Sequence, residues 1–198
     1  MALPPERRTP RMEALEAIIA RTPREKLFAF PVLQPPDHQL IGVFIQLFNY
    51  MDFNLRRAIE TFAYAKLLQG KAATKYPKIH SSGVASAVQD AVKAMDASVE
   101  DIPETIRILE IIERRREVRN LLGHWAARRI ANEDAIVLLT KDESDAMRIG
   151  GAYLGNGYVK SAILDLADIR GLITHELAPF ELWLAQKISE WRKRYIGD

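Results

Sequence analysis

One long amphipathic stretch, from Asp37 to Gln69, constrains the fold of this chain more than any other feature of the sequence. Asp37 is a good helix N-cap, because its carboxylate can accept a hydrogen bond from the backbone of the first turn. Gly70 follows the stretch, and glycine commonly ends helices. Apolar residues recur with the helical period at Ile41, Phe44, Ile45, Phe48, Met51, Leu55, Ile59 and Phe62. The sequence therefore predicts a central helix over residues 38–69.

Shorter helices are predicted on both sides of this one. The amphipathic "RMEALEAIIA" (residues 11–20) is followed by "FPVLQPPD", whose prolines block both a helix and a strand ladder. A serine at 81 or 82 can cap a helix over about 83–98, and a fourth helix runs from Asp101 to His124 with Pro103 tolerated in its first turn. Asp165 opens a last helix that reaches about Arg194 and that Pro179 is expected to kink.

Two short apolar runs before the last helix predict strands. They are "AIVLLT" (135–140) and "YVKSAI" (158–163), separated by "GGAYLGNG", a turn that lacks the GKS or GKT ending of a phosphate loop. The predicted fold class is all-α, a mostly antiparallel helical bundle with a small β-hairpin or three-stranded insertion (about 135–161) before the last helix. Residues 1–36 are expected to form an N-terminal arm with a short helix and a linker, and residues 37–198 the bundle.

Composition narrows the class of protein. The 198 residues suit one domain, and the absence of cysteine excludes disulfides and thiolate metal sites. The longest apolar-rich run has about 12 residues, whereas ~20 are needed to cross a bilayer, and "MALPPERRTP" lacks the apolar core of a signal peptide. "THEL" (174–177) has no second histidine nearby for a zinc site. We expect a cytoplasmic protein without membrane, metal or cofactor. With a net charge of +2, any nucleic-acid binding needs a local basic patch.

Two charged residues fall on apolar helical stripes. On a helical wheel Arg115 and Arg119 lie with Ile108, Ile112 and Leu122, and Arg119 is near the middle of this stripe, whereas Arg116 falls toward the polar side. Asp52 lies with the apolar residues of the long helix. A charge in such a position is costly unless it is paired. The sequence therefore predicts an Asp52–Arg119 pair, which either fixes the register of two helices or holds Arg119 ready for an anionic ligand.

His124 lies near the end of the same helix as Arg119 but on its polar face. In a straight helix the two side chains would point about 140° apart. They could serve one substrate only if Gly123 unwinds the helix end or if a second copy of the chain completes the site. In the alternative, His124 is a solvated histidine that interacts favourably with the helix dipole.

The segment "RNLLGH" (Arg119–His124) resembles the R-x4-6-H signature of HEPN-domain proteins, here of the type without a fused nucleotidyltransferase. The long helix "IGVFIQLFNYMDFNLRRAIE" is similar to an early helix of that family that often carries an acidic residue facing the motif, and Asp52 stands at the matching position. The resemblance covers roughly residues 37–130.

The resemblance implies a homodimer whose two motifs face one composite cleft, with metal-independent endoribonuclease activity and, in toxin–antitoxin or other defence systems, an antitoxin protein as partner. It implies catalytic roles for Arg119, Asn120 and His124, a supporting role for Asp52, and RNA as the ligand. Histidine suits proton transfer near neutral pH, and arginine offers a fork of donors to phosphate oxygens. Flanking phosphates would be held in a salt-sensitive way by Arg115, Arg116, Arg128 and Arg129.

The sequence departs from the family at two positions. Ala126 stands where members controlled by an AMP-transferring antitoxin have tyrosine, so that mode of inactivation is not expected. Trp125 follows the histidine, where small residues are common, and it either packs or stacks a base. The alternative function is a catalytically inactive HEPN-like module for dimerisation or RNA binding.

Overall fold

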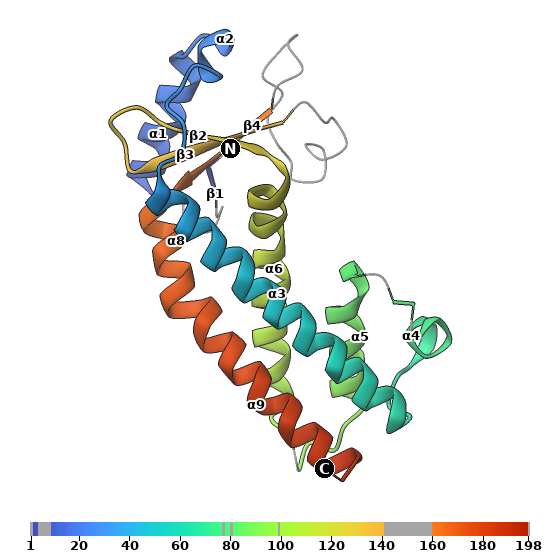
Figure 1. Ribbon diagram of the computed structural model, residues 1–198. Coiled ribbons are helices and arrows are strands. Elements are labelled where there is room, and N and C mark those ends of the chain that lie inside the picture. The colour runs from blue at the N-terminus through green and yellow to red at the C-terminus, as the bar shows by residue number, and fades with distance from the viewer. Residues whose placement is uncertain are drawn as a thin grey trace. The chain divides into compact units, whose positions relative to one another are not determined.

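The computed structural model describes residues 2–3, 9–76, 78–79, 81–98, 100–140 and 160–197, and it is mostly helical (Figure 1). The helices are α1 (Pro10–Arg21), α2 (Arg24–Leu27), α3 (Pro35–Tyr64), α4 (Gly70–Lys75), α5 (Ser81–Lys93), α6 (Ile102–His124), α8 (Leu166–Leu172) and α9 (Ala178–Tyr195), with a π-helical turn η3 (Ile173–Leu177) between the last two. The strands are β1 (Ala2–Leu3), β2 (Ala126–Arg129), β3 (Ala135–Thr140) and β4 (Lys160–Asp165). The predicted class, mostly helical with a small sheet before the last long helix, is confirmed.

The long helix α3 begins and ends earlier than its sequence predicted. Gln34 precedes its first residue, and Asp37 lies in the first turn, where Oδ2 accepts a hydrogen bond of 2.8 Å from the backbone N of Gln34. This is the carboxylate half of a capping box, so Asp37 closes the first turn from inside the helix rather than from the N-cap. At the other end Lys66 has φ 58°, a left-handed conformation that stops the helix at Tyr64, while Gly70 begins α4.

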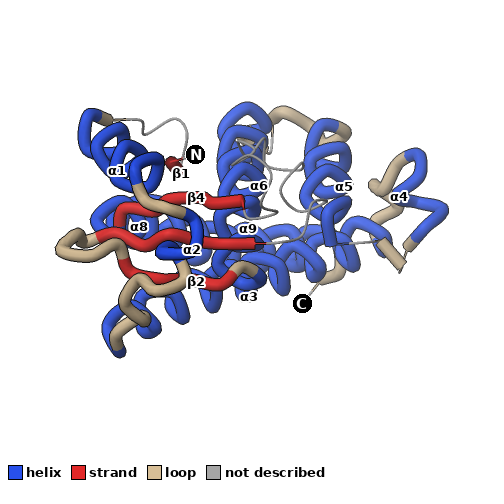
Figure 2. The backbone as a smooth tube through the Cα atoms, turned by 90° about the horizontal axis from the view of Figure 1, so that it is seen from above, coloured by secondary structure: helices blue, strands red, loops and turns tan. Residues whose placement is uncertain are grey.

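The chain forms two compact units, residues 1–45 with 117–174 and residues 46–116 with 175–198. The first unit contains a sheet with strand order β1-β4-β3-β2, in which β2, β3 and β4 are antiparallel and β1 pairs parallel to β4 (Figure 2). β3 is central, and residues on both of its faces are buried. The predicted insertion thus has a third antiparallel strand, β2, immediately after α6. The predicted "GGAYLGNG" turn lies outside the described residues.

Helix α1 packs on one face of this sheet. Thr9 caps it by accepting a hydrogen bond of 3.3 Å from the backbone N of Met12. Its buried residues Met12, Leu15 and Ile19 belong to one apolar cluster with residues of β3 and β4. The segment predicted as an N-terminal arm therefore contributes to the core of the first unit.

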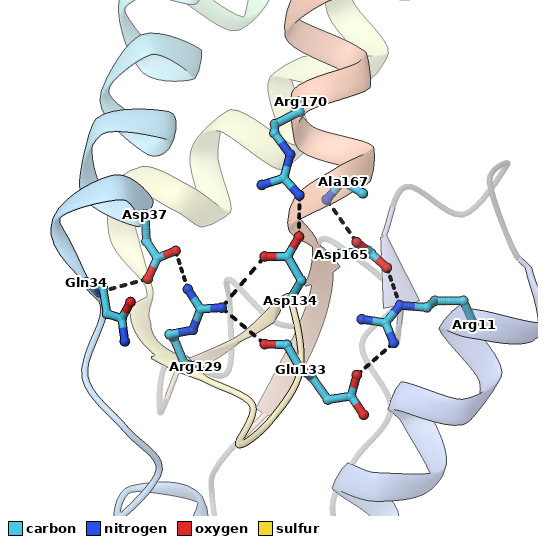
Figure 3. Close-up of polar contacts among 9 residues, drawn as sticks. All are labelled: Arg11, Gln34, Asp37, Arg129, Glu133, Asp134, Asp165, Ala167 and Arg170. Carbon is cyan, nitrogen blue, oxygen red and sulfur yellow. Dashed lines mark hydrogen bonds and ion pairs between the residues drawn. The ribbon is translucent and has the colours of Figure 1, made fainter.

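Ion pairs between segments distant in sequence border the sheet (Figure 3). Arg11 of α1 donates to Asp165 Oδ2 at 2.8 Å and to Glu133 Oε2 at 2.7 Å. The other oxygen of Asp165 accepts from the backbone N of Ala167 at 2.9 Å and so caps α8. One carboxylate therefore joins the end of β4, the start of α8 and the first turn of α1.

In the second unit α6 runs antiparallel to α9 and to α3. Arg115 of α6 pairs with Glu176, whereas the segment just before α6 contacts Trp191 near the other end of α9. Trp191 is fully buried, and its ring centroid lies 4.9 Å from that of Phe62 of α3. Pro179 lacks the N–H of a regular helix interior, and the π turn η3 lies directly before it. Pro179 was predicted to kink one continuous last helix, whereas the structure has α8, the π turn η3 and α9.

A buried glutamate connects α6 and α9 in the second unit. Glu100 Oε2 accepts from Trp191 Nε1 at 2.9 Å, and Oε1 accepts from Thr105 Oγ1 at 2.8 Å and lies 3.2 Å from Lys187 Nζ. Burial alone would raise the pKa of Glu100, but the hydrogen bonds from Trp191 and Thr105 and the charge of Lys187 outweigh it, so the pKa lies below the usual value.

We expect this carboxylate to make the chain acid-sensitive. Because the folded pKa is depressed, its contribution to stability is complete above the unfolded pKa of about 4.3 and is lost as the pH falls through the lower folded value. Urea unfolding measured between pH 7 and pH 3 should show a smaller acid-dependent loss for Glu100→Gln than for the wild type. The exposed Glu110→Gln is the control and should follow the wild type. Equal losses in all three proteins would contradict the assignment.

Candidate functional site

The segment "RNLLGH" forms the last turns of α6, which stays helical through Gly123 and ends at His124. Gly123 is exposed, and a Cβ atom built there would meet nothing within 4 Å. The helix therefore does not unwind at Gly123, which removes one of the two arrangements by which Arg119 and His124 of one chain could meet.

His124 is exposed at the C-terminal end of α6, and its imidazole has no hydrogen-bond partner in the described part of the chain. Trp125, the next residue, is only 7% exposed. It therefore packs in the core of the first unit, which is the first of the two roles that the sequence left open, packing or stacking on a base. The backbone N of Trp125 still donates to the carbonyl of Leu121 at 2.9 Å, which closes the helix before β2 begins at Ala126. His124 is thus exposed to solvent at the end of α6.

Arg119 and Asn120 lie one to one and a half turns before His124, and both are half-buried. Arg119 Nη1 donates to Asn120 Oδ1 at 3.3 Å. This hydrogen bond limits the rotamers of both side chains. A site that orients a phosphate requires side chains that are held in place in this way.

The partner of Asp52 is Arg116 and not Arg119 as the helical wheel predicted. Arg116 donates from Nη1 to Asp52 Oδ2 at 2.9 Å, and its Nε donates to Glu113 Oε2 at 2.9 Å. Its side chain is 9% exposed. Burial alone would lower the pKa of Arg116, but the hydrogen bonds and charges of Asp52 and Glu113 raise it, so the group stays charged. The buried face of this part of α6 contains Arg116 beside Ile112 and Leu109, whereas the sequence had placed Arg116 toward the polar side.

Arg115 is also buried and paired. Its Nε donates to Glu176 Oε2 at 2.8 Å, and its Nη2 donates to Glu176 Oε1 at 3.3 Å, a bidentate arrangement. The side chain of Arg115 is 6% exposed. Arg115 and Arg116 were both predicted to hold RNA phosphates; in the structure both are buried, and each pairs with a carboxylate of its own unit. The sequence did not identify Glu176 as the partner of Arg115, because Glu176 lies far away in the chain, in the irregular turn η3.

The other two predicted phosphate-binding arginines are on β2. Arg129 donates to Asp37 Oδ1 at 2.6 Å and to the carbonyl of Glu133 at 3.2 Å, so it joins the edge strand to the start of α3 (Figure 3). Arg128 is half-buried, and its Nε donates to the carbonyl of Phe28 at 3.3 Å. A structural role explains the contacts of Arg129. Arg128, in contrast, contacts no carboxylate among the described residues.

No group of three His, Asp or Glu side chains in the described residues could hold a metal ion. In the same part of the chain no helix combines the length and the apolar character needed to span a bilayer. No protein-family model, curated protein or solved structure matches the chain. Its function must therefore be argued from the arrangement of its own side chains.

Proposed function

We propose that two copies of this chain form a metal-independent endoribonuclease of the HEPN type, with Arg119, Asn120 and His124 as its catalytic residues. The observation that supports the proposal most is the state of His124, an exposed imidazole at the end of a helix, five residues after a half-buried arginine that is oriented by Asn120. Asp52 is then a positioning residue, because it holds α3 against α6 through Arg116.

The helical course of α6 supports a dimer. The helix continues through Gly123, and on an ideal helix residues at the spacing of Arg119 and His124 point about 140° apart, too far to act on the same phosphate. A second copy supplies the missing group, so that His124 of each chain acts with Arg119 of the other. The biological setting proposed is a toxin–antitoxin or other defence system, with an antitoxin protein as the further partner.

The reaction needs no metal in principle. His124 accepts the proton of a ribose 2′-OH while the 2′ oxygen forms a bond to the adjacent phosphorus. Arg119 donates hydrogen bonds to the phosphorane oxygens, where negative charge increases in the transition state. The bond from phosphorus to the 5′ oxygen breaks, and the 5′ oxygen takes up a proton from water. The products are a 2′,3′-cyclic phosphate and a free 5′-OH.

The test is RNA cleavage in the presence of EDTA by the wild type, His124→Ala, Arg119→Ala and His175→Ala. His175 is exposed on η3 and serves as the matched control. We expect His124→Ala and Arg119→Ala to lose activity by about 10²-fold or more, and His175→Ala to cleave like the wild type. Wild-type rates in both site variants would refute the roles. A wild type that binds RNA but does not cleave it would instead support the inactive module.

A mixing experiment tests the composite site directly. Neither His124→Ala nor Arg119→Ala is active alone, but a mixed dimer of the two retains one intact combination of His124 and Arg119. Because half of the randomly mixed dimers carry one of two sites, activity should recover to about a quarter of the wild-type value. Recovery requires subunit exchange, which mass spectrometry of an isotope-labelled mixture verifies. No recovery after verified exchange would place both residues in a site within one chain or in none.

A further inference from the structure

One segment of this chain contains several lysines and no acidic residue. Residues 61–89 contain four lysines and neither aspartate nor glutamate. The whole chain has a net charge of +2, so the remainder carries a small net negative charge. A local positive patch of this kind is what nucleic-acid binding requires in a protein with so little total charge.

The structure folds this segment around an open groove. The groove lies between α4 and α5 and has a volume of about 740 Å³. Figures 1 and 2 both show the two helices side by side. Lys71 and Lys75 of α4 and Lys93 of α5 line it, together with one acidic residue, Asp90. Lys93 Nζ is 3.9 Å from Asp90 Oδ1, and both side chains are more than half exposed, so this pair leaves the positive charge of α4 uncompensated.

Small side chains also line the groove. Ala72 of α4 and Ala87 of α5 contribute to its lining, and α4 has no buried residue. The side chains of Lys71 and Lys75 are exposed on this short helix. An extended chain of phosphates therefore fits the groove better than a compact anion, which would require an enclosed site.

Exposed tyrosines flank the same segment. Tyr64, the last residue of α3, is 67% exposed, and Tyr76, the residue after α4, is 39% exposed. Proteins that bind single-stranded nucleic acids combine a basic groove for the backbone with exposed aromatic rings that stack on bases. An acidic polypeptide would satisfy the lysines but would make no comparable use of the two rings.

We propose that the groove between α4 and α5 binds the backbone of single-stranded RNA through Lys71, Lys75 and Lys93, and that Tyr64 and Tyr76 stack on its bases. The choice of RNA among nucleic acids rests on the proposed ribonuclease function. The groove belongs to the second unit, whereas Arg119 and His124 belong to the first, so the proposal adds a binding surface to the chain and no catalytic residue.

The experiment measures the binding of a fluorescent 2′-O-methyl single-stranded oligoribonucleotide, which lacks the attacking hydroxyl and stays intact. We expect Lys71→Glu/Lys75→Glu to bind about tenfold or more weakly than the wild type, with a smaller dependence on salt. The matched control, Lys26→Glu/Lys193→Glu, changes the net charge by the same amount at two exposed lysines outside the groove and should bind like the wild type. Tyr64→Ala/Tyr76→Ala should weaken single-strand binding and leave any duplex binding unchanged.

Each result has one interpretation. Equal weakening by both lysine double variants would show a nonspecific effect of net charge and overturn the groove. If the wild type binds polyglutamate as tightly as the oligonucleotide, the ligand of the groove is an acidic protein and not RNA. If the wild type does not bind the oligonucleotide, the proposal is also overturned. Because the 2′-O-methyl oligonucleotide cannot be cleaved, its binding is measured independently of cleavage, so a failed cleavage test leaves the groove standing and a failed groove test leaves cleavage standing. Circular dichroism of each variant checks that it is folded.

Discussion

Replacing Arg116 by alanine is expected to lower the free energy of unfolding by about 3 kcal/mol. The guanidinium is 9% exposed and satisfies Asp52 and Glu113, so its removal leaves a carboxylate of α3 facing an apolar helix interface without its cation. Asp52 retains 27% exposure and some access to water, which places the cost at the lower end for a broken buried pair. Urea unfolding at neutral pH measures the change.

Two further variants separate the ion pair from simple packing. Arg114 is exposed two residues earlier on α6, and Arg114→Ala should change stability by less than about 0.5 kcal/mol. The double variant Asp52→Ala/Arg116→Met removes both charges and keeps most of the aliphatic stem, so it should be more stable than Arg116→Ala alone. If Arg116→Ala unfolds like the wild type, the pair does not hold α3 against α6.

Replacing Trp191 by alanine should cost about 3–5 kcal/mol. The side chain is fully buried against Phe62, and its indole N–H is one of the donors to the buried Glu100. Trp191→Phe keeps much of the ring volume but removes that donor, so we expect it to cost about 1–3 kcal/mol. Thermal unfolding of the two variants separates the loss of packing from the loss of the hydrogen bond.

Trp183 provides the control for this pair. It lies on the same helix, α9, but is only half-buried, so Trp183→Ala should cost clearly less than Trp191→Ala. In the double variant Trp191→Phe/Glu100→Gln the penalty of the lost donor should shrink, because the carboxylate that needed it has gone. Equal costs for the alanine variants at 183 and 191 would contradict the buried network.

Helices with strong periodicity and clear ends were predictable from the sequence. The predicted helix at 101–124 is observed at Ile102–His124, and the predicted strand at 135–140 has the observed bounds. The predicted end of α3 was wrong by five residues, because Lys66 and not Gly70 adopts the left-handed conformation that ends the helix. The sequence does not indicate that a lysine will adopt a left-handed conformation. A glycine does indicate a helix end, but here that indication was misleading.

Contacts between distant segments were less predictable. The helical wheel of α6 placed Arg115 and Arg119 among apolar residues but selected Arg119 as the partner of Asp52, because it assumed that one stripe continues along the whole helix. In the structure Arg115 and Arg116 are both buried, and each finds a carboxylate more than sixty residues away. Which of three neighbouring arginines meets which acid depends on the rotation of α6 against its neighbours, and that rotation is fixed by packing rather than by local pattern.

The candidate site divides in the same way. Local sequence placed Arg119, Asn120 and His124 at a helix end, and they lie there. It did not reveal β2 directly after the helix, since "AARR" is too short and too polar to read as a strand. The buried position of Glu100 was also not predicted. In the sequence a single glutamate before a helix resembles a solvated residue, and only the structure shows its hydrogen bond with Trp191.

The parallel pairing of β1 with β4 has a consequence for the order in which the protein folds. Ala2 pairs with Ile163, and Arg11 pairs with Asp165, so partners are separated by about 160 residues. At about 5–20 residues per second, the ribosome completes β4 roughly 10–30 s after β1. During that time the apolar side of α1 has no sheet to cover it, so the core that α1 shares with β3 and β4 cannot form until β4 has been synthesised.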